Sequence, residues 1–255
     1  MRYFLFVLGL VLINAAQAAA CKAVSSARTA ALVELYTSEG CSSCPPADRW
    51  LSGLGARGHV PGRVVPLALH VDYWDYIGWK DPYAKREFSL RQRKLTQLQR
   101  MALVYTPQVL LQGRDFRAWG SSAFDEAVER INSQPARASI TLEIRPGNPA
   151  VLDVVASSEL VAPEKNNDAA LYLAAYQNRL ESEVTAGENR GRRLPHDYVV
   201  LEWQGPFGFD PAGRLAERRG LPLLPKASRT DSGVVGFIQN RRTTEVLQAL
   251  MLPAC

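Results

Sequence analysis

The sequence predicts an α/β domain followed by a smaller β-rich domain, and three observations support this. An apolar run of strand-forming residues leads into Cys41-Ser42-Ser43-Cys44, and helix-forming residues follow it. Further apolar runs and amphipathic segments then alternate up to residue 135. After residue 135 the chain consists of short β-rich segments separated by Pro, Gly and Asn, which is typical of antiparallel, sandwich-like domains.

Length and composition exclude several classes of protein. The chain has 255 residues, of which 47% are hydrophobic and 22% charged, with 18 Gly and 16 Pro. This profile is that of a folded protein, and it excludes a disordered tail, a collagen-like rod and a disulfide miniprotein. The formal net charge of +5 is modest for this length and does not indicate a nucleic-acid partner.

The first twenty residues have the layout of a secretory signal peptide. Arg2 supplies a positive charge, an uncharged apolar run covers residues 3–13, and small residues suited to cleavage follow up to Ala20. The apolar run is too short to span a bilayer. We therefore expect residues 1–20 to be removed and the mature protein to be exported to the periplasm. Export is a second argument against nucleic acid.

Cys21 follows this segment directly and admits three interpretations. An Ala-x-Ala cleavage site explains the surrounding residues most simply. In a lipoprotein Cys21 would be acylated, and only then is a membrane an expected partner. The third interpretation is a bridge to Cys255, because chain termini are often close together and disulfides persist in exported proteins.

The first domain is expected over residues 28–135. Its strands are predicted at three apolar runs, residues 30–37, 64–71 and 107–111. A long helix is predicted over residues 83–103, where apolar side chains recur at helical spacing from Ala84 to Ala102, and a shorter one over residues 124–131. The second domain is expected over residues 136–255. Its strands are predicted at residues 139–144, 151–157, 169–177, 198–203 and 234–239.

The functional prediction depends on Cys41 and Cys44. Between a strand and a helix, Cys41 would lie at the helix N-terminus, where free N–H groups and the helix dipole stabilise a thiolate. Cys44 would lie one turn further on, close enough to attack a mixed disulfide formed by Cys41. A structural zinc site needs two more ligands at matching spacing, and His59, His70 and His196 do not provide them. We therefore expect a redox pair without a metal or an organic cofactor.

Two neighbouring residues favour the redox interpretation. Glu34 stands in an apolar strand seven residues before Cys41, and a buried carboxylate there would take the proton of the resolving thiol. The alternative is that Glu34 points to solvent at a strand edge. Pro107 begins a strand after Thr106, and a cis peptide bond there would expose a backbone edge beside the cysteines. An ordinary trans bond is the alternative.

These residues resemble known families. LVELYTSEGCSSC, the following helix and YTPQVLL are similar to thioredoxin-like proteins. ELYTSEGCSSCPPAD, HVDYWDYIGWKDPYA, YTPQVLLQGR and GENRGRRLPHDYVV resemble a family of secreted bacterial proteins, thioredoxin-like and catalogued only as a domain of unknown function. The resemblance covers residues 30–239 and implies a thioredoxin-like first domain, with residues 83–103 as a helical insertion. It also implies roles for four residues: Cys41 as nucleophile, Cys44 as resolving thiol, Pro107 as cis-proline and Glu34 as buried acid.

The chain departs from thioredoxins at two points near the cysteines. Gly40 stands where thioredoxins carry Trp, and two prolines, Pro45 and Pro46, follow Cys44 directly. These differences bear on the redox potential and on the surface offered to a partner more than on the fold.

An aromatic cluster follows the second predicted strand. Its members are Tyr73, Trp74, Tyr76 and Trp79. Loops after parallel strands gather at one end of a sheet, so this cluster is expected to border the cysteines. One interpretation is a groove wall for a peptide or a small apolar thiol, with Thr106, Trp74, Tyr76 and Trp79 as substrate-binding residues. The alternative is a packed hinge.

The predicted function is an exported thiol–disulfide oxidoreductase that acts on a protein or small thiol substrate and is recycled by a redox partner. Two alternatives stay open. One is a redox-inactive binding module in which the Cys41–Cys44 bridge is a static clamp. The other is a copper-handling protein of Sco type, in which both thiolates and His70 or His59 would bind Cu(I), although Sco proteins resemble CxxxC. The sequence does not identify the substrate, the direction of electron transfer or the oligomeric state.

Overall fold

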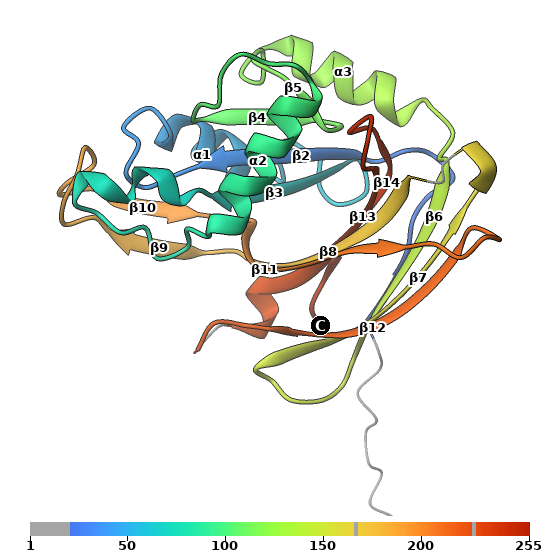
Figure 1. Cartoon of the computed structure of the whole chain (residues 1–255). Coiled ribbons are helices and arrows are strands. Elements are labelled where there is room, and N and C mark those ends of the chain that lie inside the picture. Colours follow the sequence, from blue (N-terminus) through green and yellow to red (C-terminus); the bar gives the residue numbers. More distant parts are fainter. Residues whose placement is uncertain (1–20, 166–167, 226–227) are drawn as a thin grey trace, which may run out of the picture.

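A computed structural model describes residues 21–165, 168–225 and 228–255 (Figure 1). The predicted signal peptide lies outside these residues. The described chain is mixed α/β and mostly sheet, with three α-helices: α1 (Pro45–Ser52), α2 (Arg86–Leu98) and α3 (Ser122–Asn132). None of the helices in this described part is long and apolar enough to cross a membrane.

An eight-stranded sheet forms the centre of the molecule, in the order β14-β13-β8-β11-β3-β2-β4-β5. Its strands are β2 (Ala31–Thr37), β3 (Val64–His70), β4 (Gln108–Leu111), β5 (Arg114–Asp115), β8 (Ala169–Gln177), β11 (Val199–Gly208), β13 (Ser232–Asn240) and β14 (Val246–Pro253). β2 and β3 are parallel, and β4 is antiparallel to β2. Strands from before and after residue 135 are joined where Val199 of β11 pairs with Ala68 of β3.

A second, four-stranded sheet packs on the C-terminal part of the central sheet. It consists of β1 (Cys21–Val24), β6 (Ala138–Arg145), β7 (Val151–Leu160) and β12 (Arg214–Pro222), in the order β1-β6-β7-β12. Buried and exposed residues alternate along β6 and β7, as expected for strands with one face on a core. Their buried side chains share a hydrophobic core with those of β8, β13 and β14.

The helices cover both faces of the β2–β3 region. Because successive side chains of a strand point to opposite faces, Glu34 and Tyr36 share one face of β2, and Thr37 lies on the other. Glu34 is ion-paired with Arg91 of α2, so α2 covers its face, in front of β2 and β3 in Figure 1. On the other face α1 and α3 pack together through Trp50 and Phe124, whose ring centroids are 5.0 Å apart.

The helix expected over residues 83–103 is shorter than predicted, because α2 spans Arg86–Leu98. Before it, Tyr83 N donates to Asp81 Oδ1 and Lys85 N donates to His70 O, so these donors are used outside a helix. After it, Arg100 has a positive φ of 54°, which ends the helical path. The residues before α2 connect it to the end of β3, and the residues after it lead to the start of β4.

A small hairpin completes the fold beside the start of α1. It is formed by β9 (Leu180–Glu183) and β10 (Arg193–His196), which pair in antiparallel register. Figure 1 shows it at the same end of the molecule as α1 and the loop after β3. The sequence predicts neither strand, because both are short and polar.

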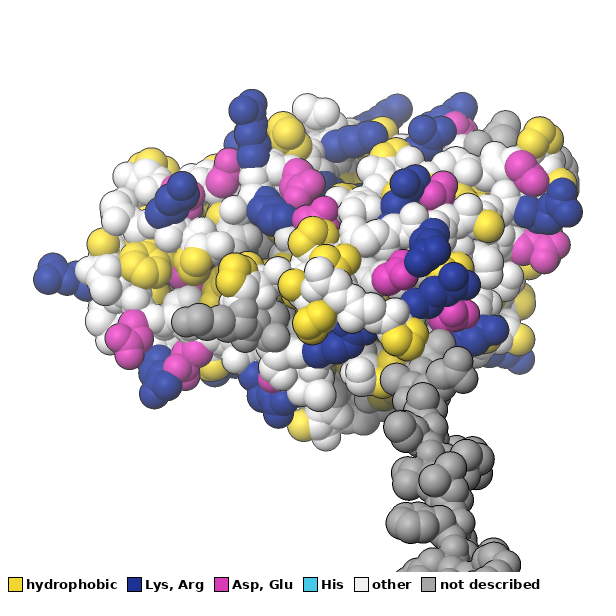
Figure 2. Space-filling model, turned by 90° about the horizontal axis from the view of Figure 1, so that it is seen from below, with side chains coloured by type: hydrophobic (Ala, Val, Ile, Leu, Met, Phe, Trp, Pro, Cys, Tyr) yellow, Lys and Arg dark blue, Asp and Glu magenta, His cyan; other side chains and the backbone are white. Residues whose placement is uncertain are grey.

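Charges of both signs are mixed over the face of the molecule that Figure 2 shows. Figure 2 shows Lys and Arg side chains interspersed with Asp and Glu on this face, with hydrophobic side chains between them. On this face the charges therefore do not form a large patch of one sign.

Candidate functional site

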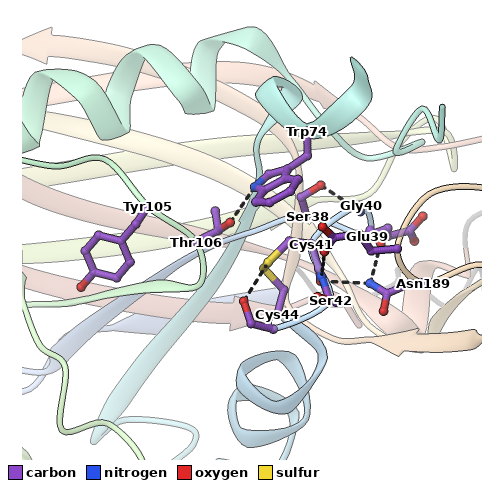
Figure 3. The surroundings of a disulfide bond; sticks show 12 residues. Ser38, Glu39, Gly40, Cys41, Ser42, Cys44, Trp74, Tyr105, Thr106 and Asn189 are labelled. Atoms are coloured by element: carbon purple, nitrogen blue, oxygen red, sulfur yellow. Dashed lines mark hydrogen bonds between the residues drawn. A yellow bond between two sulfur atoms is a disulfide. The ribbon is translucent and has the colours of Figure 1, made fainter. Parts of the chain in front are cut away.

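Cys41 and Cys44 form a disulfide between the end of β2 and the start of α1, with their Cα atoms 5.4 Å apart (Figure 3). Cys44 is the N-cap of α1, and prolines occupy the first two helical positions. Proline is tolerated there because the first N–H groups of a helix have no intrahelical partner. Cys41 is held in the preceding turn by a hydrogen bond from its N–H to Ser38 O (3.2 Å).

The disulfide is covered. Cys41 is 1% exposed and Cys44 is 0% exposed. Figure 3 shows the indole of Trp74 over Cys41, and Trp74 Nε1 donates to Thr106 Oγ1 at 2.7 Å. Trp74 belongs to η1 (Asp72–Ile77), a 3₁₀ helix that packs against Gly40, where a Cβ atom would lie 3.1 Å from Trp74 Cβ. Glycine at position 40 therefore lets η1 lie directly on the cysteine loop.

Besides η1, a second chain segment borders the disulfide, and it begins at Thr106. The Thr106–Pro107 peptide bond is cis, and β4 starts at the next residue. Through the Trp74–Thr106 hydrogen bond, this segment and η1 meet beside the disulfide. The structure thus brings together four of the residues singled out from the sequence, namely Cys41, Cys44, Trp74 and Thr106, with Pro107 adjoining them.

The other two aromatic candidates have different surroundings. Tyr76 is 82% exposed and stacks on Trp74, with ring centroids 6.4 Å apart. Trp79 is half-buried, and its Nε1 donates to Glu39 Oε2 at 2.7 Å. Tyr76 therefore offers a free aromatic surface next to the site, whereas Trp79 positions a carboxylate in the loop between β2 and Cys41.

Glu34 does not lie beneath the cysteines, contrary to the prediction. It is fully buried, but it projects from the face of β2 that is covered by α2, where its Oε1 accepts a hydrogen bond from Arg91 Nε (2.7 Å). The guanidinium of Arg91 in turn lies 4.7 Å from the ring centroid of Trp203. The alternative of a solvent-exposed edge position is also wrong, since the carboxylate is part of an internal ion pair.

Two buried histidine–carboxylate pairs lie behind the cysteine loop. His196 Nε2 is 3.0 Å from Glu39 Oε1, and His70 Nδ1 is 2.7 Å from Asp81 Oδ2. The two imidazole rings are perpendicular, with centroids 5.0 Å apart. His196, which the sequence analysis considers only among possible zinc ligands, thus forms a hydrogen bond to Glu39.

The pKa values of one of these pairs are shifted in opposite directions. Burial alone would lower the pKa of His70, but the negative charge and hydrogen bond of Asp81, with the charges of Asp48 and Glu39, raise it to about 8. Burial opposes ionisation of Asp81, yet the charge and hydrogen bond of His70 and two backbone N–H groups lower its pKa. The pair therefore favours its ionic form.

Asp48, in the first turn of α1, is a third buried carboxyl group at the site. It is 7% exposed, and burial raises its pKa, while the charges of His196 and His70 and the hydroxyl of Thr37 oppose the increase. These interactions place Asp48 on the cysteine side of the sheet, near both histidines. The backbone N–H of Asp48 donates a hydrogen bond to Cys44 O (3.1 Å), as expected within a helix.

The loop between β9 and β10 binds the cysteine loop from outside. Asn189 is fully buried, and its Nδ2 donates to Glu39 O (2.8 Å) and Cys41 O (2.9 Å). Ser42 N donates to Glu188 Oε2 (3.0 Å), and the hydrogen bonds from Ser42 lower the pKa of this carboxyl. A segment about 150 residues further along the chain therefore fixes the backbone on both sides of Cys41.

Sequence reasoning missed Asn189, Asp48 and Asp81 as members of the site. Asn189 lies in GENRGRRLPHDYVV, one of the segments that resemble the family, but nothing in its spacing connects it with Cys41. Asp48 had a detectable signal, since it follows Cys44 by four residues and lies on the same helical face.

No group of three or more His, Cys, Asp and Glu side chains is arranged to hold a metal ion within the described ranges. The two histidines considered for copper have carboxylate partners. His70 is paired with Asp81, and His59 Nε2 lies 3.0 Å from Asp125 Oδ1.

A second disulfide joins Cys21 to Cys255, with Cα atoms 5.9 Å apart. The backbone N–H of Cys255 also points to Cys21 Sγ (2.9 Å). This is the third of the interpretations considered for Cys21. With both bridges formed, the part of the chain that the structure describes contains no free cysteine.

Comparison with known proteins gives a family and a fold. Residues 32–239 match a family described as "Protein of unknown function (DUF1223)". No curated protein matches the sequence. A crystal structure of a protein from Agrobacterium tumefaciens has a TM-score of 0.65 and 23% identity, and the match covers 89% of this chain and 96% of that one. HBP35 of Porphyromonas gingivalis has a TM-score of 0.67 and 15% identity, with 90% and 76% covered. At these identities the likeness shows the fold alone.

Proposed function

Because this chain belongs to the DUF1223 family, whose members are described only as proteins of unknown function, we propose a function from its own geometry. In this proposal the protein is an exported thiol–disulfide oxidoreductase that acts through Cys41 and Cys44 on a protein or small thiol substrate. The observation that carries this proposal is the placement of the Cys41–Cys44 bridge at a helix N-terminus, beside the chain segment that begins at Thr106.

The order of the elements supports a thioredoxin-like assignment for residues 28–135. Its elements follow as β2, α1, β3, α2, β4, β5 and α3, and the strands lie in the order β3-β2-β4-β5 with β4 antiparallel to β2. In this arrangement α2 is the connection between β3 and β4. Helices lie on both faces of this part of the sheet, as in other sheets with parallel crossovers.

The chemistry of the proposed reaction is thiol–disulfide exchange. In the reduced protein the Cys41 thiolate attacks a substrate disulfide, forms a bond to one sulfur and releases the other as a thiolate that takes a proton from water. Cys44 then loses its proton and attacks Cys41 Sγ, which releases the second substrate thiolate and forms the Cys41–Cys44 bridge. Two electrons pass to the substrate, and a thiol–disulfide partner returns the protein to the reduced state. The reverse sequence oxidises a substrate dithiol.

The residues around the bridge have distinct roles in this proposal. Thr106 and Pro107 provide the edge against which the substrate backbone lies, and Tyr76 provides an exposed aromatic contact. Trp74 covers Cys41 and must move, or be displaced by substrate, before the sulfur is attacked. Glu34 has no part in the exchange, because its carboxylate is ion-paired on the opposite face of the sheet.

The first test is the reduction potential of the Cys41–Cys44 pair in the mature protein, measured in glutathione or dithiothreitol buffers by alkylation and mass spectrometry. A reversible two-electron transition between about −120 and −270 mV is expected, as in known oxidoreductases. A Cys44→Ser variant should then retain substrates as mixed disulfides at Cys41, and Cys41→Ser is the matched control that should retain none.

A pair that stays oxidised below about −300 mV would contradict the proposal, since such potentials are typical of structural disulfides. That result would favour a binding module with a static bridge. One observation already favours this second candidate, because both cysteines are almost fully buried. The absence of trapped adducts in the Cys44→Ser variant would support the same conclusion.

We also propose export to an oxidising compartment such as the periplasm, from the signal-like residues 1–20 and from two disulfides in the described chain. In the bridged form the Cys21 thiol is not free for acylation, which favours a protein released from the membrane.

A further inference from the structure

A buried cluster of titratable side chains lies behind the disulfide on the α1 side of the sheet. Its members are Glu39, Asp48, His70, Asp81 and His196, each less than 9% exposed. They come from separate parts of the chain. Glu39 follows β2, Asp48 lies in α1, His70 ends β3, Asp81 follows η1, and His196 ends β10. The exchange chemistry described above uses none of them.

Two of the three carboxylates in this cluster have full sets of partners. Glu39 accepts one hydrogen bond from Trp79 Nε1 and is paired with His196. Asp81 is paired with His70 and accepts from two backbone N–H groups, those of Glu39 and Tyr83. Both carboxylates hold the cysteine loop and the imidazoles in place.

Asp48 differs from them. Its Oδ1 is buried and accepts no hydrogen bond from any described residue, and the same holds for His70 Nε2. An unpaired buried polar atom is costly, so its retention in a site requires an explanation. A carboxyl oxygen and an imidazole nitrogen without fixed partners are both able to exchange a proton.

Helix geometry places Asp48 next to Cys44. The two residues are four apart on α1, so their side chains lie on one face, and the side chain of Asp48 leans back toward the helix N-terminus. On its other side are Thr37 and His70, which pair across β2 and β3 and project toward α1. Asp48 therefore lies between the resolving cysteine and the His70–Asp81 pair.

We propose that Asp48 is the group that accepts the proton of Cys44 when this thiol attacks the mixed disulfide at Cys41. The inference rests on the proposed exchange function. In the step, the S–H bond of Cys44 breaks and its proton forms an O–H bond with Asp48, while the sulfur electron pair forms the bond to Cys41 Sγ. The Cys41–substrate bond breaks, and its electron pair leaves on the substrate thiolate. The proton then returns to the departing thiolate through His70 or water.

The surroundings of Asp48 suit this role. Burial raises its pKa, which brings the carboxylate closer to the range in which it accepts a proton at neutral pH. His70 and His196 favour the ionised form, and Asp81 opposes it. Glu39 faces the same cluster, through its effect on His70. Arg91, the cation nearest to Glu34, lies on the other face of the sheet and does not affect this balance.

The test separates the attack by Cys44 from the attack by Cys41. The reduced protein is mixed with dithiobis-nitrobenzoate after peptide mapping has verified that Cys21–Cys255 is intact. Cys41 releases the first equivalent of nitrothiobenzoate in a phase whose rate depends on reagent concentration. Cys44 releases the second in a first-order phase, because it attacks within the molecule. The rate of this second phase is measured across a pH series in the wild type, Asp48→Asn and Glu34→Gln.

In Asp48→Asn we expect the second phase to slow about a hundredfold at neutral pH, which is the lower end of the range for general-base catalysis. Its pH midpoint should rise toward about 8.5, the ordinary pKa of a cysteine. Glu34→Gln should leave this phase unchanged. An unchanged second phase in Asp48→Asn overturns the inference, as does a loss confined to Glu34→Gln. A wild type without a second phase contradicts the exchange function itself, and the inference with it.

A measurement on the wild type does not require the variants to fold. The rate of the second phase in the wild type is compared in H2O and in D2O at matched acidity. The phase should be slower in D2O, because the S–H bond of Cys44 breaks in the same step as the attack when Asp48 accepts the proton. Equal rates in the two solvents overturn the inference, since they would show that Cys44 has already lost its proton before it attacks.

Discussion

His70 links the stability of the protein to pH through a single buried side chain. Its pKa is about 8 in the folded protein and 6.5 in the unfolded chain, mainly because the charge of Asp81 outweighs the effect of burial. A group whose pKa is higher in the folded state stabilises that state when it is protonated. The stabilisation is therefore present in full below about pH 6.5 and is lost as the pH rises through about 8.

We expect this histidine to contribute about 2 kcal/mol to the free energy of unfolding at low pH, from a difference of about 1.5 in pKa. Urea unfolding of the oxidised protein across a pH series should show stability falling between about pH 6.5 and 8. In His70→Gln the fall should disappear. His59→Gln, which removes a histidine outside the cluster, should retain it, and an equal fall in His70→Gln would show that other groups are responsible.

The misplacement of Glu34 shows which information the sequence lacks at the residue scale. All seven residues of β2 are buried, so the strand has no polar face that would identify the side on which Glu34 projects. The side depends on where α1 and α2 pack, and these contacts are made by distant residues such as Arg91. Cys41, Cys44 and Pro107 were found because their chemistry is encoded in local spacing, whereas Asn189 and Asp81 reach the site only through tertiary structure.

At the scale of elements, η1 covers the disulfide through Trp74. Trp74 is fixed over Cys41 by its hydrogen bond to Thr106 and by stacking with Tyr76. A hydrogen bond contributes about 1 kcal/mol and an aromatic pair about 0.5–1.5 kcal/mol. Because one factor of ten corresponds to about 1.4 kcal/mol, removing this cover should expose Cys41 about tenfold more often.

Trp74→Ala should therefore increase the rate at which dithiothreitol reduces the Cys41–Cys44 bridge by about tenfold. The rate is measured by quenching with an alkylating reagent and counting modified Cys41 by mass spectrometry. Trp119→Ala, which removes an indole that packs on Trp50, is the control and should leave the rate unchanged. Equal rates in the wild type and Trp74→Ala would show that η1 does not limit access.

The elements that the sequence predicts are those with strong apolar patterns. The expected strands at residues 30–37, 64–71 and 169–177 correspond to β2, β3 and β8, which are buried along their whole length. The β9–β10 hairpin is missed because its strands are short and contain charged residues. The hairpin nevertheless borders the site, since Asn189 in the loop between its strands donates a hydrogen bond to Cys41 O. Pattern reasoning therefore finds the core and misses the polar segments that surround the site.

At the scale of the whole molecule, the Cys21–Cys255 bridge closes a loop between residues that are 234 positions apart. A cross-link over a long loop removes conformations mainly from the unfolded chain. We expect the double variant Cys21→Ser/Cys255→Ser to lose about 3–5 kcal/mol in the free energy of unfolding. Urea denaturation with the Cys41–Cys44 bridge verified as intact measures the loss, and a change below about 1 kcal/mol would contradict the expected effect.

Continuity of the central sheet adds a second kind of connection. Val199 of β11 pairs with Ala68 of β3, two residues before His70, and the β9–β10 hairpin immediately precedes β11. The strands after residue 135 thus support the segment that carries Asn189 and His196. Nothing in the local sequence of either half predicts this pairing, because it depends on which strand edges are free after each half has formed.

With its first and last described residues bonded through sulfur, the described chain is topologically a ring. A protease that cuts one surface loop produces two pieces that remain a single covalent body, so the cut opens the ring without separating it. For the same reason the positions of the chain ends are not essential to the architecture. The ring can be opened at another loop, with residues 21 and 255 joined by a short linker, and every strand keeps the neighbours that it has now.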